Sequence, residues 1–338
     1  MNVNEIREKS RSVIGPYCKS CPVCNGKACS NKIPGTGAKG TGTVAIKNYD
    51  AWQKIEVKMD TLAENKEIDT TFKMFGKSFK YPIFAGPVGA VSQHYSDLYN
   101  DNSFNEIYVR ACAKSGIAAF TGDGLNEEIM IHATHAIKEN NGIGVPTIKP
   151  WDKDTCFKKL DLANESNAFA IAMDIDAAGL PFLQGRIPPA GRKSVEEVKE
   201  IIDYAHVPFI VKGIMSVEGA QKAVDAGAKA IVVSNHGGRV LDGTPATACV
   251  LEEIADQFKG QVKIIVDGGI RSGLDVFKAL ALGADAVIIA RPFVNMIYGG
   301  KDEGVEAYVQ QLGQELENTM MMTGVSSLRE ISKKNIYK

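Results

Sequence analysis

The chain has 338 residues, with 39 basic and 40 acidic side chains and a formal net charge of -1. Such a balanced charge provides no electrostatic attraction for nucleic acid or a membrane surface, so a small molecule is the expected partner. The N-terminus lacks the apolar stretch of a signal peptide and no apolar run is long enough to span a bilayer, which predicts a cytoplasmic protein.

Four of the seven cysteines lie in one short run near the N-terminus, at Cys18, Cys21, Cys24 and Cys29. In a cytoplasmic protein such a run is more typical of metal ligands than of disulfides. The spacing is close to, but not the same as, that of ferredoxins. An iron-sulfur cluster and a zinc ion are therefore both candidate occupants, with redox-active or free thiols as the alternative. The other three cysteines are expected to be buried on helices.

A glycine-rich arm over 33–42 follows the cysteines. It lacks the spacing of a Walker phosphate loop and no strand precedes it, so an extended lead that lies over the mouth of the next domain is expected. The predicted domains are accordingly a cysteine- and glycine-rich extension over 1–42 and a single larger domain over 43–338.

From about residue 80, short apolar runs alternate with amphipathic stretches, the pattern of βα units around a parallel sheet. Eight strands are predicted, which is the number of a (β/α)8 TIM barrel. Their ranges are 82–85, 117–121, 143–148, 169–174, 209–212, 230–234, 262–267 and 286–290.

The intervening segments include several helix patterns. Ser194 and Ser216 precede Glu-bearing first turns and are predicted N-caps. The segment 175–193 contains three prolines and no clear periodicity, which predicts a mobile loop over the open face of the barrel. The predicted helices are 126–138, 194–204, 217–226, 246–258, 273–282 and 303–322.

Charged and glycine residues gather just after the predicted strands, where a TIM barrel keeps its chemistry. His236 and Arg239 follow the sixth strand with Gly237 and Gly238 between them. An imidazole there has a suitable pKa for proton transfer, and an arginine three residues on can hold a carboxylate at two points. Lys212 ends the fifth strand, where a lysine is costly to bury unless it faces an anion.

The end of the barrel formed by strands seven and eight has the features of a phosphate site. Gly268 and Gly269 allow close approach of backbone N–H groups to oxygen, and Arg291 adds a bidentate cation. The strand-end motifs, taken in order, resemble those of the FMN-dependent 2-hydroxy acid oxidases and dehydrogenases, the family of glycolate oxidase and lactate oxidase. They are Val211-Lys212-Gly213, Ser234-Asn235-His236-Gly237-Gly238-Arg239, Asp267-Gly268-Gly269-Ile270-Arg271 and Ala290-Arg291-Pro292.

This resemblance implies oxidation of a 2-hydroxy acid to a 2-oxo acid, with hydride transfer to FMN. His236 is then the base, Arg239 holds the substrate carboxylate and Lys212 stabilises the reduced flavin. Asp174 matches the aspartate that pairs with the histidine, and its neighbour Asp176 is a competitor. The implied flavin-binding residues are Pro87, Val88, Gly89, Thr147, Lys212, Ser234, Asp267, Gly268, Gly269, Arg271, Ala290 and Arg291.

The residues that contact substrate in this family are not all present. Lys149 stands where a tyrosine is usual after strand three, and Pro181 stands where the loop after strand four usually has an arginine. The tryptophan usual after strand two is replaced within Gly122-Asp123-Gly124. Lys149 is a candidate second carboxylate contact, and the substrate cannot be assumed to be lactate or glycolate.

Three readings remain open from the sequence. The first is the hydroxy acid dehydrogenase or oxidase, with dioxygen or a protein or quinone as electron acceptor. The second is an FMN-dependent isomerase or reductase on the same barrel. The third is a non-catalytic, metal-bearing redox sensor. An iron-sulfur centre beside the flavin would offer electrons an exit other than dioxygen, and a homo-oligomer is implied by the family.

Overall fold

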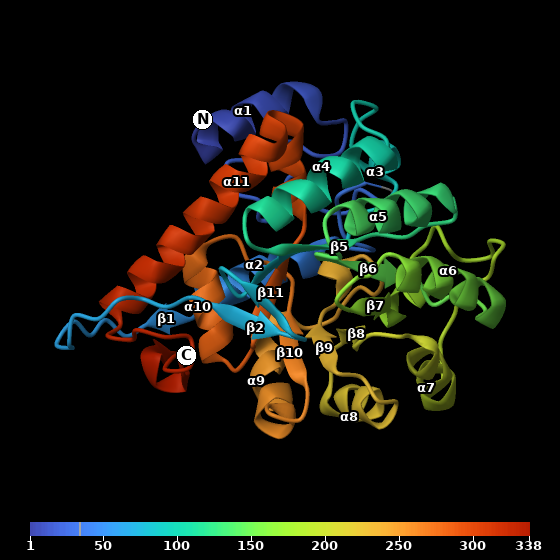
Figure 1. Cartoon of the computed structure of the whole chain (residues 1–338). Helices are drawn as coiled ribbons and strands as arrows, with labels where there is room; N and C mark the ends of the chain where they lie inside the picture. Colours follow the sequence, from blue (N-terminus) through green and yellow to red (C-terminus); the bar gives the residue numbers. More distant parts are fainter. Residues whose placement is uncertain (34) are drawn as a thin grey trace.

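The structure is a computed structural model that describes residues 1–33 and 35–338, so Pro34 of the glycine-rich arm lies outside the described residues. Eight parallel strands form a closed barrel, each followed by a helical segment, and the predicted (β/α)8 TIM barrel is confirmed (Figure 1). The barrel strands are β4 (Ile83–Ala85), β5 (Ala118–Thr121), β6 (Gly144–Ile148), β7 (Ile171–Asp174), β8 (Phe209–Ile214), β9 (Ala230–Val233), β10 (Lys263–Val266) and β11 (Ala286–Ile289).

The strands pair in chain order, and the last closes onto the first. Ile289 of β11 is the Cα partner of Ala85 in β4, and Asp174 of β7 is the partner of Lys212 in β8. Because all eight strands are parallel, their carboxyl ends share one rim, and the side chains that follow them converge there. β8 runs two residues beyond the predicted end at Lys212, with a register shift between Lys212 and Ile214.

The opposite end of the barrel is closed by a hairpin. Its strands are β2 (Phe72–Met74) and β3 (Lys77–Phe79), which precede the barrel in the chain. Phe79 packs edge-on against Phe84 of β4, with ring centroids 5.1 Å apart, and lies 5.4 Å from the ring of Phe169. Both hairpin strands belong to the same buried cluster as the barrel interior. Because this hairpin closes one end of the barrel, the rim at the carboxyl ends of the strands is the open end.

Helices surround the barrel, and the predicted caps are present. Ser194 accepts a hydrogen bond from the N–H of Glu197, and Ser216 accepts one from Gly219. The helices after the barrel strands are α3 (Val91–His94), α4 (Asp101–Lys114), α5 (Glu128–Glu139), α6 (Lys153–Glu165), α7 (Val195–Tyr204), α8 (Val217–Asp225), α9 (Thr247–Phe258), α10 (Gly273–Ala281) and α11 (Arg291–Met322).

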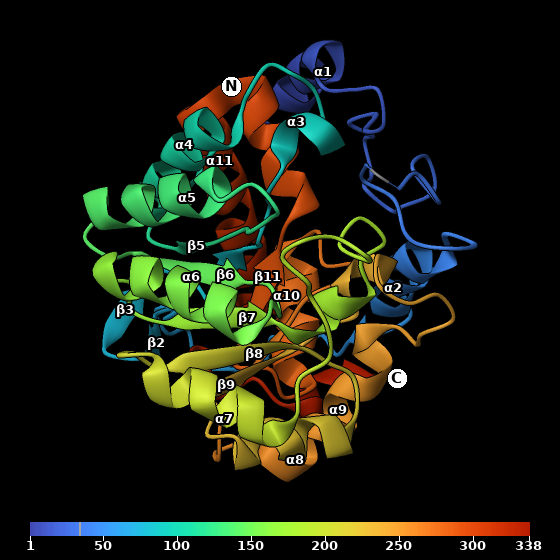
Figure 2. The same cartoon turned by 90° about the vertical axis from the view of Figure 1, so that its right-hand side faces the viewer.

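The N-terminal region wraps around one side of this barrel. α1 (Val3–Val13) packs against α11, and α2 (Thr43–Gln53) packs against α9. Between them the cysteine run and the glycine-rich arm pass the carboxyl rim, beside the loop that follows β7 (Figure 2). A short pair of β1 (Glu56–Val57) and β12 (Ile336–Tyr337) joins this region to the C-terminus. In the described part of the chain, no helix has the length and apolar character to cross a membrane.

Candidate active site

A cavity of about 340 Å³ opens at the carboxyl rim. Its volume falls in the range of sites that bind small organic molecules. Gly35 and Thr36 of the arm form part of its wall, and Leu180, Phe182 and Arg186 of the loop after β7 form another part. The predicted position of both segments over the open face is therefore correct.

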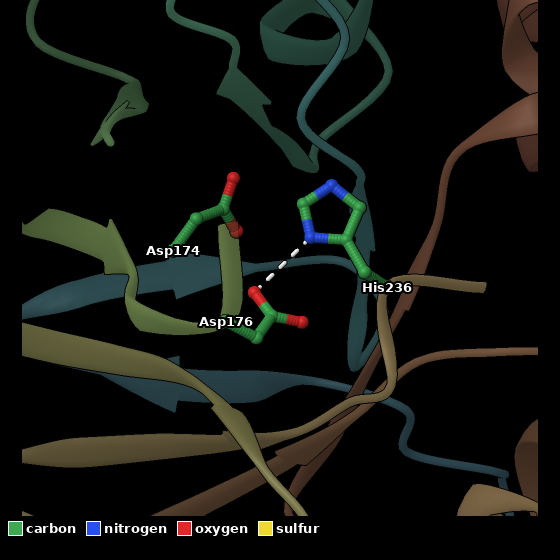
Figure 3. A group of neighbouring side chains, drawn as sticks. All are labelled: Asp174, Asp176 and His236. Atoms are coloured by element: carbon green, nitrogen blue, oxygen red, sulfur yellow. Dashed lines mark hydrogen bonds and ion pairs between the residues drawn. The ribbon is translucent and has the colours of Figure 1, made fainter. Parts of the chain in front are cut away.

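His236 projects into this cavity from η2 (His236–Gly238), the single 3-10 turn after β9. Its Nδ1 lies 3.1 Å from Oδ1 of Asp176, in η1 (Ile175–Gly179) after β7 (Figure 3). Burial first, and then Lys212, lowers the pKa of His236 below its ordinary value, although Asp176 and Asp174 oppose the shift. The imidazole is neutral at pH 7 and, with Nδ1 turned to the carboxylate, presents Nε2 as a proton acceptor.

The sequence-based pairing of His236 with Asp174 is wrong. Asp174 lies near the imidazole but sits between two lysines, with Lys149 Nζ 2.8 Å and Lys212 Nζ 2.9 Å from its carboxylate oxygens. Burial opposes ionisation of Asp174, yet the two ammonium groups lower its pKa below the ordinary value. Burial also opposes the charge on Lys212, but Asp174, Asp176 and Asp267 raise its pKa. Asp174 thus helps to keep Lys212 charged in the barrel interior and also pairs with Lys149.

Arginines give the cavity its anion-binding character. Arg239 donates to the carbonyl of Gly35, Arg271 donates from Nε to the carbonyl of Cys24 at 2.6 Å, and Arg291 donates to the carbonyls of Thr36 and Gly237. Among the described residues, none of these three guanidinium groups has a carboxylate partner. Burial lowers the pKa of Arg239 to about 10, so it remains a cation at neutral pH. The positive charge is available for anionic ligands.

Two glycines allow close contacts between segments around the cavity. A Cβ on Gly237 would overlap the guanidinium of Arg291, and one on Gly269 would overlap the backbone of Asn48 in α2. Gly269 also has a φ of +85°, which L side chains rarely adopt. α11 begins at Arg291, so the positive end of its dipole and the N–H of Arg291 join the guanidinium groups at this end of the cavity, a favourable place for a phosphate.

The same motifs identify the chain's relatives. The model of the family described as FMN-dependent dehydrogenase matches residues 35–186 and 185–338. The chain belongs to this family. A peroxisomal (S)-2-hydroxyacid oxidase of Arabidopsis thaliana is 43% identical over 144 residues, which cover 43% of this chain and 39% of that protein. An L-lactate dehydrogenase of Xanthomonas campestris is 46% identical over 145 residues, covering 43% of this chain and 37% of that protein.

Solved structures of the family match over nearly the whole chain. A structure described as a lactate oxidase of Pediococcus acidilactici has a TM-score of 0.79 at 28% identity and covers 99% of this chain and 93% of its own. A mandelate oxidase with an FMN adduct has a TM-score of 0.80 at 25% identity and covers 98% of each chain. By contrast, the matched segment spans about two fifths of the curated relatives' length.

Within this family member, most of the predicted site residues line the cavity. They are Pro87, Val88, Gly89, Lys212, His236, Arg239, Asp267, Gly268, Gly269, Arg271, Ala290 and Arg291. Three do not. Thr147 and Asp174 are buried behind its wall, and Ser234 is buried with its hydroxyl donating to Asp267 Oδ2 at 2.9 Å. Thr147 and Ser234 therefore pack against the cavity wall and do not line it.

The four clustered cysteines lie outside the cavity wall but close to one another. They are partly buried and form no disulfide. Burial first, and then the neighbouring sulfurs, raises the pKa of Cys18 to about 12 and raises that of Cys21. Of the remaining cysteines, Cys112 and Cys156 are buried on helices as predicted, but Cys249 on α9 is exposed, so its predicted burial is wrong.

The cavity residues that were not singled out from the sequence include His94, Tyr95 and Arg186. Asp123 lies in the Gly122-Asp123-Gly124 segment, within which the tryptophan usual after strand two is replaced. Its buried carboxylate lies 2.6 Å from Nζ of Lys159, so a lysine of α6 balances its charge. Arg186 lies in the same loop as the missing family arginine, five residues beyond Pro181. A search for any arginine in 175–193 that could reach the rim would have found it.

His94 supplies a pH prediction. It is buried, its Nδ1 accepts a hydrogen bond from the N–H of Gly35 at 3.2 Å, and burial lowers its pKa to about 3. Below an unfolded pKa of about 6.5 the unfolded chain binds a proton that the folded site does not. Each unit by which the pH is lowered in this range therefore reduces the free energy of unfolding by about 1.4 kcal/mol. We expect the fall in melting temperature between pH 7.5 and pH 5 to be smaller in His94→Gln than in wild type. An equal fall in both proteins would contradict this.

Proposed function

We propose that the protein binds FMN in the rim cavity and oxidises a 2-hydroxy acid to the corresponding 2-oxo acid. The observation that carries this proposal is the largely buried imidazole of His236, neutral and paired at Nδ1 with Asp176, in a cavity whose arginines have only carbonyl partners. A base beside an anion-binding wall is what abstraction of a proton from a hydroxy acid requires.

The described residues fit FMN. The first turn of α11 with Arg291 and the turn at Gly268 and Gly269 suit a phosphate dianion. Asp267 Oδ1 is buried and has no hydrogen-bond partner among the described residues, so it suits a hydroxyl of the ribityl chain. Lys212 offers a charged ammonium for the flavin ring. Bound FMN would supply the acceptor for the hydride removed from the substrate carbon.

The remaining residues act on the substrate. His236 Nε2 would accept the proton of the α-hydroxyl, and Asp176 at Nδ1 would stabilise the imidazolium that results. Arg239 would hold the carboxylate and so orient the α-carbon. Lys149 is tied to Asp174, which leaves Arg186 on the facing loop as the better second cation for a carboxylate.

The proposal is tested by adding a panel of 2-hydroxy acids to the purified protein without oxygen and recording the flavin spectrum. We expect at least one acid to bleach the flavin bands and to yield an equimolar 2-oxo acid. Flavin that no acid bleaches would reject the hydroxy acid chemistry and favour an isomerase or reductase. Protein that folds without retaining added FMN would reject the cofactor.

We further infer a homo-oligomer from the family resemblance and a cytoplasmic location from the amino-acid sequence, with dioxygen or a protein or quinone as electron acceptor. Light scattering tests the oligomeric state. Oxygen consumption compared with reduction of a quinone or of ferricyanide tests the acceptor. Zinc and an iron-sulfur cluster are the two metal occupants that the cysteine spacing allows.

A further inference from the structure

The cysteine run is folded onto the wall of the cavity. Arg271, which lines the cavity, donates to the carbonyl of Cys24 at 2.6 Å, and Cys18 Sγ donates to Asn295 of α11 at 3.2 Å. Gly35 and Thr36, six and seven residues beyond Cys29, already belong to the wall. The segment is thus fixed to the same elements that form the site, and nothing in the proposed chemistry of His236 uses it.

The backbone of this run makes two left-handed turns, at Ser20 and Gly26. Ser20, between the first two cysteines, has a φ of +43° and is buried, with its hydroxyl donating to the carbonyl of Arg7 at 3.0 Å. Gly26 has a φ of +83° and packs on Ala45 of α2. These turns bring the four sulfurs close enough to influence one another's charge, although they are not joined in disulfides.

The surroundings suit a group of net negative charge. Four thiolates around a metal core carry an excess of negative charge, which neighbouring cations must offset. Arg11 donates from its guanidinium to the carbonyl of Ser20 at 3.1 Å, and Arg271 donates to the carbonyl of Cys24. Two arginines therefore hold backbone carbonyls within the run, although Arg11 also pairs with Glu8 at 2.7 Å.

The spacing of the cysteines in the sequence, rather than an assembled set of sulfurs, favours a cluster over a single ion. A tetrahedral zinc with Zn–S bonds of about 2.3 Å needs its four sulfurs about 3.8 Å apart. Among the described residues, however, no three cysteine sulfurs lie within 4.8 Å of one another. An iron-sulfur cubane binds each thiolate on a different iron and so holds the sulfurs farther apart, and the first three cysteines have the spacing of a ferredoxin run.

We propose that Cys18, Cys21, Cys24 and Cys29 bind an iron-sulfur cluster that carries electrons out of the cavity to a one-electron acceptor. Oxidation of one 2-hydroxy acid releases two electrons and two protons. The cluster carries one electron at a time, so two transfers to an external carrier balance one turnover and the protons pass to water. Cluster binding stands on the cysteines alone, whereas the electron route rests on the proposed function.

Purification without oxygen, followed by metal and sulfide analysis, tests the site directly. We expect about four iron and four acid-labile sulfide per chain, the content of one cubane, and an electron paramagnetic resonance signal after reduction with dithionite. Stoichiometric zinc without iron would overturn the cluster, and protein with neither metal would overturn the site.

Matched variants separate the site from other thiols. Cys21→Ser is expected to lose most of the iron, whereas Cys249→Ser, which changes an exposed thiol on α9, is expected to keep it. Equal iron in all three proteins would overturn the ligand assignment. Should Cys21→Ser fail to fold, the iron, sulfide and zinc content of the wild-type protein still decides the proposal.

A second measurement separates the electron route from the hydroxy acid chemistry. A substrate that bleaches the flavin without oxygen is expected to produce the same resonance signal as dithionite. A bleached flavin with a cluster that only dithionite reduces would overturn the electron route. Flavin that never bleaches in protein with a full complement of iron would reject the proposed function and leave the cluster in place.

Discussion

Replacing His236 with asparagine is expected to slow the reduction of bound flavin by a 2-hydroxy acid about 10²–10⁴-fold, the usual contribution of a positioned general base. Asparagine is chosen because it tolerates the left-handed backbone at this position, where φ is +55°. The rate is measured in single-turnover, stopped-flow experiments without oxygen. His135→Ala, which changes an exposed histidine on α5, is the matched control and should retain the wild-type rate.

Two further observations make this result specific to the imidazole. The asparagine variant should retain flavin, because the anion end of the cavity is unchanged. In wild type the rate should be constant at neutral pH and fall only on the acid side of the ordinary histidine pKa, because burial lowers the pKa of His236. A variant rate within tenfold of wild type, at unchanged flavin content, would show that another group is the base.

Replacing Asp174 with asparagine is expected to lower the free energy of unfolding by about 3–5 kcal/mol, the usual effect of removing one partner from a buried ion pair. The carboxylate is 1% exposed and lies between the ammonium groups of Lys149 and Lys212, which are 8% and 2% exposed. The variant leaves two buried cations without their principal counter-ion. Chemical denaturation at pH 7.5 measures the loss, and a change below 1 kcal/mol would contradict this account of the network.

A second substitution tests the cause of that loss. Adding Lys149→Met to Asp174→Asn removes one of the stranded cations, so the double variant should be more stable than Asp174→Asn alone. Asp256→Asn serves as a surface control, because its carboxylate is 58% exposed and pairs with Lys333. Exposed pairs contribute about 0–1 kcal/mol, so this control should differ little from wild type.

The barrel and the residues at its rim could be read from the sequence because each depends on local order. Alternating apolar runs and capping serines identify most strands and helices within a few residues, as Ser194 and Ser216 illustrate, although α11 begins at Arg291, well before the predicted start at 303. The strand-end motifs then place His236, Arg239 and the glycines at one rim, because parallel strands share it. The location of these residues at the rim was therefore predicted correctly.

The contacts between side chains far apart in the sequence were decided only by the tertiary structure. Asp174 is still part of β7 and is in register with Lys212 of β8, so its carboxylate faces the lysines of the neighbouring strands. Asp176 comes two residues later, where η1 turns the chain toward η2, and so it reaches His236. The sequence by itself determined that two carboxylates follow the strand, but only the direction of the chain at its end decided which of them meets the imidazole.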